Sequence, residues 1–302
     1  MGVSVGSVRL PNPVMTASGT AGHGAELAAY QPLDELGAVV VKSLSADPWP
    51  GNPAPRVHAA PAGMRNSVGL QGPGVAAWLA DDLPALEATG ARVVASIWGR
   101  SIDDYRRAAE ALAAAPAAVV AVEVNLSCPN TESGRGLFAH DPEATAEVVT
   151  ATAPCARPRW AKLSPNTSRV VEVAGAATEA GAEAVTLVNT LMGMAIDPDA
   201  RTYRLGAGER GGGLSGPALH PVAVRVVHDV HRAHPEVPIV GVGGVVDAAT
   251  AVELMLAGAC AVQVGTATFA DPRAPSRVRR DLEHWCRRRG IPSVAELTGG
   301  LR

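Results

Sequence analysis

One cysteine lies among residues suited to acid–base chemistry. Cys128 belongs to the run Asn-Leu-Ser-Cys-Pro-Asn over residues 125–130, and residues 131–136 after it include several small side chains. A thiol with an ordinary pKa of about 8.5 can accept a proton once solvent is excluded. The other three cysteines have no such polar neighbourhood and are expected to be small buried apolar side chains. Cys128 is therefore the candidate general base.

Two lysines indicate a ligand that gains negative charge during the reaction. Lys42 and Lys162 each end a short apolar run. A buried ammonium group is costly unless it meets an anion or an electron-rich ring. Reduced flavin, which is anionic near its N1 and O2 atoms, is one such ligand. A lysine that forms an imine with a sugar phosphate is the alternative.

Two glycine-containing segments predict a phosphate site. Gly243 and Gly244 follow one apolar run, and Gly265 and Thr266 follow the next. Glycine allows backbone N–H groups to approach a phosphate closely. The phosphate could belong to a cofactor or to a phosphosugar substrate, and the same glycines would also suit tight turns.

Five amide or hydroxyl side chains are suited to a small planar ligand with carbonyl, ring N–H and carboxylate groups. They are Asn66, Asn125, Asn130, Asn189 and Thr190. A pyrimidine acid matches this array. The eight histidines lack metal-ligand spacing, and the cysteines form no C-x-x-C pair. No metal site is therefore expected in this chain.

These candidate residues follow short apolar runs that are expected to be buried parallel strands. Stretches with helical periodicity lie between the runs, several of them opened by an N-cap residue such as Ser101, Asp141 or Asp247. The expected strands are residues 13–16, 38–41, 92–96, 119–124, 159–163, 184–188, 238–242 and 261–264. The expected helices are residues 75–86, 103–115, 142–152, 169–180, 221–234, 248–256 and 277–289.

Eightfold alternation of strand and helix predicts a single α/β domain over residues 1–302, a (β/α)8 TIM barrel. Active sites of such barrels are built just after the carboxyl ends of the strands, so the candidate residues should meet at one mouth. Two connections, residues 44–74 and 191–217, are too long for simple loops. They are expected at this mouth, either covering a ligand or forming hairpins that only cap the barrel.

Composition limits the class of protein. The 302 residues are 47% hydrophobic and 18% charged, which is typical of a folded domain with a large core. The formal charge of −3 argues against a general nucleic-acid binder. The sequence has neither a long apolar run nor a signal-peptide pattern, so a cytoplasmic protein without a membrane segment is expected.

The sequence resembles the dihydroorotate dehydrogenases, flavin enzymes of pyrimidine biosynthesis, and within them the catalytic subunit of the class 1B form. The similarity runs over about residues 4–298. Its most specific segments are residues 51–56, 66–71, 125–130, 162–166, 189–193 and 212–217. Class 2 members carry an N-terminal membrane-associating extension and a serine base, and this sequence resembles them less.

The resemblance implies an FMN-dependent barrel that oxidises (S)-dihydroorotate to orotate in de novo UMP synthesis. Cys128 would remove the proton from C5 of the substrate while a hydride leaves C6 for N5 of the flavin. The implied substrate residues are Lys42, Asn66, Ser67, Val68, Gly69, Leu70, Asn125, Asn130, Asn189 and Thr190. The implied FMN residues are Ser18, Lys42, Ser43, Ser96, Asn125, Lys162, Val188, Gly216, Gly243, Gly244, Gly265 and Thr266.

Ser96 is a departure from the family, which usually has asparagine at this position. A contact to the flavin ring would be shortened there or replaced by water, and the flavin potential could differ. The other implied residues agree with the positions selected above from the strand ends alone.

The class of a dihydroorotate dehydrogenase determines its electron acceptor. Class 1B enzymes pair the FMN chain with a subunit carrying FAD and a [2Fe–2S] cluster and reduce NAD⁺, so a homodimer and a heterotetramer with that subunit are expected. The alternatives are a class 1A-like enzyme that uses fumarate and an oxidoreductase of a related dihydropyrimidine. A phosphosugar lyase or isomerase on the same barrel is a more distant alternative. A flavin-dependent reductase of uridine in RNA would need a basic RNA-binding domain, for which charge and length leave no room.

Overall fold

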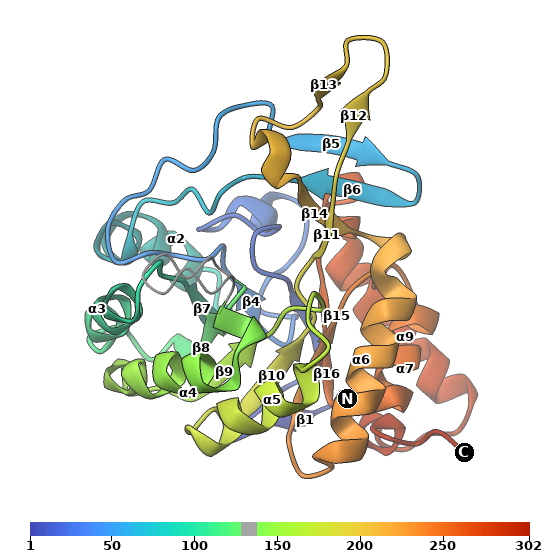
Figure 1. Ribbon diagram of the computed structural model, residues 1–302. Helices are drawn as coiled ribbons and strands as arrows, with labels where there is room; N and C mark the ends of the chain where they lie inside the picture. Colours follow the sequence, from blue (N-terminus) through green and yellow to red (C-terminus); the bar gives the residue numbers. More distant parts are fainter. Residues whose placement is uncertain (128–137) are drawn as a thin grey trace.

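Eight parallel strands form the centre of the molecule in the computed structural model, which describes residues 1–127 and 138–302 (Figure 1). The strand order is β3-β16-β15-β10-β9-β8-β7-β4, and all neighbours in it are parallel. The strands are β3 (Val14–Thr16), β4 (Val39–Val40), β7 (Val93–Ile97), β8 (Val119–Asn125), β9 (Arg159–Lys162), β10 (Ala184–Leu187), β15 (Ile239–Val242) and β16 (Ala261–Val264). Each lies within or close to a range expected from the sequence.

Hydrogen bonds between β3 and β4 join the two ends of this sheet. The amide of Gly37 donates to the carbonyl of Val14 at 2.8 Å, and that of Thr16 donates to Ala38 at 3.3 Å. The Thr16 hydroxyl accepts from the amide of Val40 at 2.8 Å and donates to the Val40 carbonyl at 3.2 Å. A side chain thus completes the ladder, and the expected (β/α)8 barrel is confirmed.

Thr16→Val is expected to destabilise the protein by about 1–3 kcal/mol, because the buried Val40 amide would lose its acceptor at nearly unchanged volume. The measurement is the free energy of unfolding in urea. Thr186→Val is the matched control. The buried Thr186 hydroxyl has no hydrogen-bond partner among the described residues, so its loss should cost little. Equal destabilisation by both substitutions would contradict the closing role of Thr16.

Helices surround the barrel, and three predicted N-caps are present. Ser101 accepts from the amide of Asp104, Asp141 accepts from Glu143 and Ala144, and Asp247 accepts from Thr250. The longer helices are α3 (Ile102–Leu112), α4 (Pro142–Ala151), α5 (Val170–Glu179), α6 (His220–Ala233), α7 (Ala248–Ala257) and α9 (Ala274–Arg288). The short helices are α1 (Val75–Ala77), α2 (Leu83–Glu87) and α8 (Ala267–Ala270), with a π-helix, Trp78–Asp82, joining α1 to α2.

The first crossover differs from the expected eightfold alternation. Between β3 and β4 the chain forms only a short 3₁₀ helix, Glu26–Ala29. The segment before that helix contains Gly19, Gly22 and Gly24, and the first two adopt positive φ angles that helices exclude. The expectation of eight strand–helix units is therefore wrong for this unit, although the barrel still closes.

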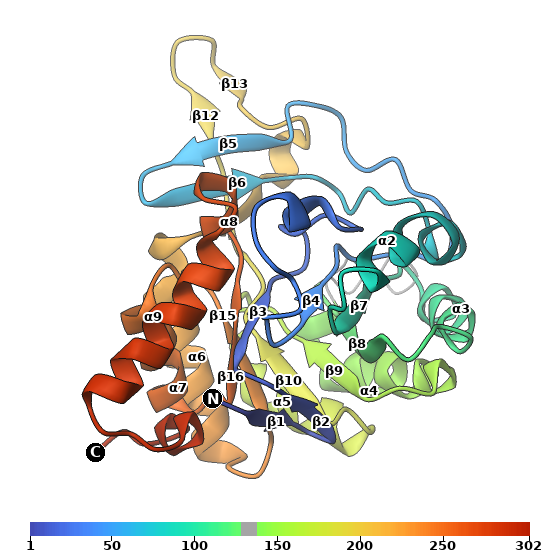
Figure 2. The same ribbon diagram turned by 180° about the vertical axis from the view of Figure 1, so that it is seen from behind.

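The two long connections form one additional sheet at one end of the barrel (Figures 1 and 2). Residues 44–74 supply β5 (Val57–Ala60) and β6 (Gly63–Asn66), and residues 191–217 supply β11 (Leu191–Gly193) and β14 (Gly212–Ser215). The antiparallel order is β11-β14-β6-β5. A hairpin of β12 (Ile196–Asp197) and β13 (Thr202–Tyr203) projects beyond this sheet, and β1 (Val3–Val5) with β2 (Val8–Leu10) lies at the opposite end.

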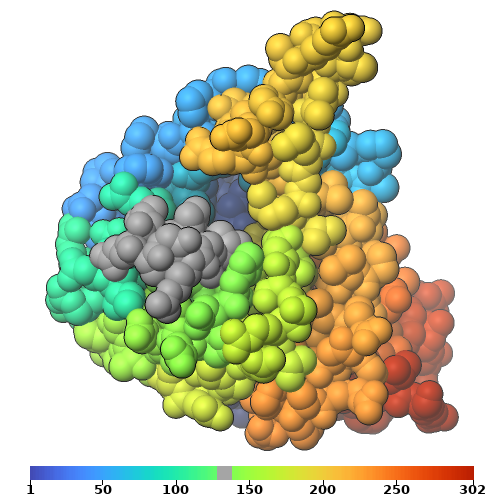
Figure 3. Space-filling model, viewed as in Figure 1, coloured from blue at the N-terminus to red at the C-terminus, as the bar shows by residue number. Residues whose placement is uncertain are grey.

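The surface is hollowed beside the additional sheet (Figure 3). Dark blue atoms from the N-terminal part of the chain are visible at the bottom of this hollow, with the yellow β11–β13 segment on one side. No helix of the described residues combines the length and the hydropathy needed to span a bilayer.

Candidate active site

The carboxyl ends of the eight parallel strands meet at the end of the barrel that carries the additional sheet (Figure 1). Most of the described residues that the sequence selected lie in or directly after one of these ends, whereas residues 66–70 and Gly216 belong to the additional sheet or follow its strands. Ser18 follows β3, and Lys42 and Ser43 follow β4. Ser96 lies next to the last residue of β7, and Asn125 is the last residue of β8. The expectation of one polar mouth therefore agrees with the topology. Cys128 and Asn130 lie outside the described residues.

A buried charged network crosses the barrel interior below this mouth. The Lys162 ammonium donates to the Ser18 hydroxyl at 2.8 Å and to Oε1 of Glu123 at 3.3 Å. The amide of Gln263 donates to Oε2 of Glu123 at 2.7 Å. Glu123 and Gln263 are fully buried and Lys162 is 4% exposed. The sequence interpretation selected Lys162 and Ser18 but missed Glu123 and Gln263, which fix the ammonium in place.

A second network joins four of the selected side chains. The hydroxyls of Ser43 and Ser96 lie 2.8 Å apart, and Nδ2 of Asn125 donates to the Ser43 hydroxyl at 3.2 Å. Nδ2 of Asn189 donates to Oδ1 of Asn125 at 3.2 Å. The hydroxyl of Tyr105, from α3, donates to the backbone carbonyl of Asn125 at 2.6 Å. Ser96 is fully buried here and serves as the partner of Ser43.

Gly213 of strand β14 lies next to Asn66, the last residue of β6, and to Thr190, which directly precedes β11. Nδ2 of Asn66 donates to the Gly213 carbonyl at 3.4 Å. A Cβ atom at Gly213 would lie 2.0 Å from Oγ1 of Thr190, so glycine is required for Thr190 to occupy this place. The additional sheet therefore positions two predicted substrate residues, which favours the covering role over a simple cap.

The loop after β6 presents backbone in unusual conformations. Gly69 and Leu70 have φ angles of +71° and +60°, and the latter is uncommon for a leucine. The Ser67 hydroxyl is buried without a hydrogen-bond partner among the described residues, as is the Ser127 hydroxyl. Such unpartnered buried groups are uncommon and call for an explanation, which a bound polar ligand would supply.

Lys42 is a partly buried cation near this loop. Its ammonium makes no ion pair or hydrogen bond with the described residues. Burial, with a smaller contribution from the nearby Arg56 guanidinium, lowers the pKa of Lys42 below its ordinary value. An anionic ligand beside Lys42 would relieve this cost.

The predicted phosphate residues form a cradle that accepts only glycine at key positions. Gly216 and Gly244 have φ angles of +93° and +69°. A Cβ atom at Gly244 would lie 2.9 Å from the Gly216 carbonyl oxygen, and one at Gly216 would lie 3.4 Å from Cγ2 of Thr266. The Thr266 hydroxyl donates to that of Ser215 at 2.8 Å. A cradle of this kind leaves backbone accessible to a phosphate group, and the Lys162–Ser18 pair is suited to an electron-rich ring.

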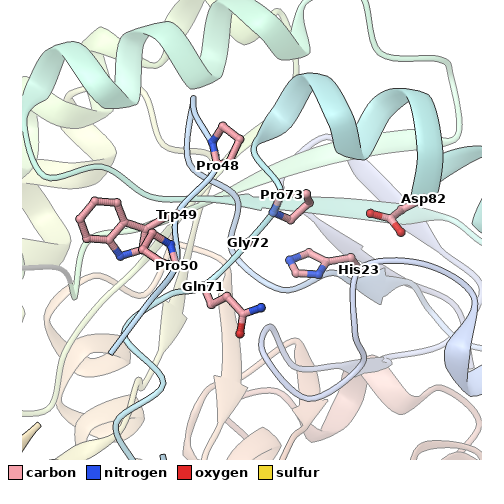
Figure 4. Close-up of a pocket in the computed structure, with 8 residues that line it drawn as sticks. All are labelled: His23, Pro48, Trp49, Pro50, Gln71, Gly72, Pro73 and Asp82. Atoms are coloured by element: carbon pink, nitrogen blue, oxygen red, sulfur yellow. The ribbon is translucent and has the colours of Figure 1, made fainter. Parts of the chain in front are cut away.

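A separate cavity of about 550 Å³ is lined by His23 and by parts of the long connection after β4 (Figure 4). Its lining residues are His23, Pro48, Trp49, Pro50, Gln71, Gly72, Pro73 and Asp82. The Lys42 amide donates to the carbonyl of Gly22 at 2.9 Å, which places His23 next to the site. Burial, and then the charge of Lys42, lowers the pKa of His23. The sequence interpretation assigned no role to His23, Trp49 or Asp82.

Neither of the networks at the mouth is a metal centre. Within residues 1–127 and 138–302 no group of histidine, cysteine, aspartate and glutamate side chains is arranged to hold a metal ion. Apart from the Glu123 carboxylate, which accepts from Lys162 and Gln263, the polar groups of these networks are amides, hydroxyls and an ammonium group, which suit an organic ligand with carbonyl and anionic oxygens.

A (β/α)8 barrel with polar side chains and two lysines gathered at its carboxyl end is typical of barrel enzymes. The family model for dihydroorotate dehydrogenase matches residues 1–286. The chain belongs to the dihydroorotate dehydrogenase family.

Curated relatives resemble the chain over its whole length. The dihydroorotate dehydrogenase B (NAD(+)) catalytic subunit of Geotalea uraniireducens is 45% identical over 302 residues, which is 100% of this chain and 98% of the relative. The subunit with the same name in Alkaliphilus oremlandii is 44% identical with the same coverage. The one in Geobacter metallireducens is 42% identical over 303 residues, again 100% and 98%.

Proposed function

We propose that the protein is the FMN-binding catalytic subunit of a class 1B dihydroorotate dehydrogenase and oxidises (S)-dihydroorotate to orotate in pyrimidine biosynthesis. The observation that carries this proposal is the placement of the Lys162–Ser18 pair and the glycine cradle at one mouth. These two features suit the ring and the phosphate of one cofactor. Family membership and the names of the relatives support the same reaction.

FMN, when bound, supplies the hydride acceptor at its N5 atom. The chain supplies the remaining functions. Lys162, which Glu123 and Ser18 hold in place, would stabilise the negative charge that the flavin gains on reduction. The substrate residues Asn66, Asn125, Asn189 and Thr190 orient the planar ring, and Lys42 neutralises its carboxylate. Cys128 accepts the proton from C5, in the role that the resemblance assigns to it.

The test of this function is direct. Purified protein is expected to be yellow, to release FMN on denaturation, and to lose its flavin absorbance when (S)-dihydroorotate is added without oxygen. A related dihydropyrimidine serves as the competing substrate. Protein that cannot take up FMN, or whose bound FMN is not reduced by dihydroorotate, would contradict the proposal.

The buried ion pair argues against Lys162 as the imine-forming lysine of a phosphosugar lyase or isomerase. An imine-forming lysine must be a neutral amine when it attacks a carbonyl. Lys162 instead lies 3.3 Å from the Glu123 carboxylate, in a buried ion pair. This contact supports a role for Lys162 beside a flavin over a role in imine formation.

Lys42→Met is expected to raise the Kd for orotate by roughly 10- to 100-fold, because one charge-assisted contact is worth about 1.5–3 kcal/mol. The lowered pKa of Lys42 adds a pH effect. A lysine with a lowered pKa loses its proton at a lower pH than usual, so wild-type affinity for the anionic product should fall early as the solution becomes alkaline. The measurement is orotate titration followed by flavin absorbance.

Lys42→Arg is the matched control, since arginine stays charged at every pH of this titration. The affinity of this variant for orotate should not fall in alkaline solution as that of the wild type does. Identical alkaline profiles for the wild type and Lys42→Arg would show that another group titrates.

Electrons are proposed to leave through a partner subunit carrying FAD and a [2Fe–2S] cluster, with NAD⁺ as the final acceptor. The words "NAD(+)" and "catalytic subunit" in the names of the relatives support this part. NAD⁺, fumarate, a quinone and oxygen should be offered to the chain alone and with its co-purifying partner. NAD⁺ reduction that requires the partner is expected. Fumarate reduction by the isolated chain would favour the class 1A alternative.

The proposed assembly is a homodimer that becomes a heterotetramer with the electron-transfer subunit. Apolar side chains on β11 to β13 support a protein interface on this part of the chain. Met192 is 54% exposed, Ile196 57% and Tyr203 49%. Sedimentation velocity of the isolated chain is expected to give a dimer, and a monomer at micromolar concentration would contradict this part of the proposal.

A further inference from the structure

Trp49, in the connection between β4 and β5, is hydrogen-bonded to the loop that follows β6. Its amide donates to the Gly72 carbonyl at 2.9 Å, and its carbonyl accepts from the Gly72 amide at 3.0 Å. Both residues line the cavity shown in Figure 4. The indole Nε1 of Trp49 donates to the Gly69 carbonyl at 3.0 Å. Trp49 therefore holds the loop on both sides of Leu70, one of the implied substrate residues.

The indole ring of Trp49 is itself held by the barrel. Trp98, which directly follows β7 and is 3% exposed, packs edge to face on it, with ring centroids 6.1 Å apart and an angle of 71° between the planes. Cζ of Arg100 lies 4.3 Å from the centroid of the Trp49 ring. Both kinds of contact are favourable. The hydrogen bond to Gly69 therefore attaches the substrate loop to the carboxyl end of β7.

This hydrogen bond determines how the peptide group between Gly69 and Leu70 is oriented. The two residues have φ angles of +71° and +60°, and a leucine keeps such a conformation only where surrounding contacts impose it. The carbonyl and the N–H of a trans peptide point in opposite directions. Because the Gly69 carbonyl faces Trp49, the Leu70 N–H points away from Trp49. No described residue accepts a hydrogen bond from this N–H.

We propose that Trp49 is a positioning residue for substrate binding, which orients the Gly69–Leu70 peptide so that the Leu70 N–H donates to an anionic oxygen of the substrate. This inference rests on the proposed function, since it takes dihydroorotate and orotate, which both carry a carboxylate, as the ligands of the loop. Trp49 touches neither ligand and acts through the loop. A donor that is oriented in advance binds more tightly, because less freedom is lost on binding.

The experiment uses Trp49→Phe, which removes the indole N–H but keeps a ring that can pack on Trp98 and Arg100. FMN-loaded protein is titrated with orotate and followed by flavin absorbance. We expect the Kd for orotate to rise roughly 3- to 10-fold, the scale of one neutral hydrogen bond. The limiting rate of flavin reduction at saturating dihydroorotate should hardly change, because a contact made equally in the bound state and during hydride transfer affects binding alone. The affinity for FMN should not change.

Two further variants make the test specific. Trp49→Ala also removes the ring, so the loop loses its attachment to Trp98 and Arg100, and the Kd for orotate should rise further than in Trp49→Phe. Trp285→Phe is the matched control. Trp285, on α9, is partly buried like Trp49 and also has an arginine on its ring, with Cζ of Arg289 4.1 Å from the centroid. Trp285→Phe should bind orotate like the wild type.

An orotate Kd that is the same in the wild type, Trp49→Phe and Trp285→Phe would overturn the proposal. A lower free energy of unfolding in Trp49→Phe together with that unchanged Kd would assign Trp49 a structural role only. Equal losses of orotate and FMN affinity would also overturn the proposal, because they would show a general disturbance of the mouth. A wild type that binds FMN but not orotate is a different result, which would overturn the proposed function and the role of Trp49 together.

Discussion

Replacing Cys128 with alanine is expected to lower the rate of dihydroorotate oxidation by about two to four orders of magnitude, the usual contribution of a positioned general base. The reason is that the C5 proton would lose its acceptor while the FMN residues stay unchanged. The rate of flavin reduction after rapid mixing with dihydroorotate is the measurement. Cys128→Ser should also be slow but should gain activity at high pH, because an alcohol is a much weaker acid than a thiol.

Described residues on either side of the 128–137 range are attached to the barrel. The amide of Leu126 donates to the Lys162 carbonyl at 3.1 Å, and that of Ala139 donates to the Leu126 carbonyl at 3.0 Å. The rings of Tyr105 and Phe138 pack edge to face with centroids 5.5 Å apart. Leu126 and Ala139 are therefore both attached at the carboxyl end of the barrel.

Cys260→Ala is the matched control for this prediction. Burial raises the pKa of Cys260 to about 11, so its thiol stays protonated and cannot serve as a base at neutral pH. Cys155 and Cys286 are buried, as the sequence interpretation expected, and burial raises the pKa of each. Cys260→Ala should keep the wild-type rate. Near wild-type oxidation by Cys128→Ala at neutral pH would show that a different group takes the proton.

The barrel could be predicted from the sequence because its signals are local. Continuous apolar runs specify strands buried on both faces, and Ser101, Asp141 and Asp247 specify where helices begin. The additional sheet could not be predicted in this way. Its strands β6 and β14 pair across nearly 150 residues, as in Asn66 with Gly213, and no local pattern encodes that register.

The same difference between local and long-range signals explains which site residues could be predicted from the sequence and which could not. Residues after strand ends could be selected because parallel topology brings all of them to one mouth. Glu123 and Gln263 lie within strands β8 and β16, which are not neighbours, and they meet only across the barrel interior. A signal was present, since Glu123 interrupts an apolar run two residues before Asn125 and so shares its face of the strand.

Glu123→Leu is expected to lower the free energy of unfolding by about 3–5 kcal/mol, the cost of leaving a buried charge without its partner. The Lys162 ammonium, which is 4% exposed, would keep the Ser18 hydroxyl as its one hydrogen-bond partner among the described residues. The Gln263 amide would lose its acceptor. Lys162→Met should destabilise by a similar amount, because it leaves the fully buried Glu123 carboxylate with Gln263 alone. Urea unfolding of the flavin-free protein measures both effects.

The double variant Glu123→Leu with Lys162→Met separates stability from chemistry. Replacing both members of a buried ion pair by apolar side chains is often neutral or stabilising, so the double variant should unfold at nearly the wild-type urea concentration. It should nevertheless reduce FMN slowly, because no ammonium remains at the flavin edge that becomes anionic. A double variant with wild-type stability and wild-type flavin reduction would show that Lys162 only neutralises Glu123, whereas additive destabilisation would show that the two side chains do not act as a pair.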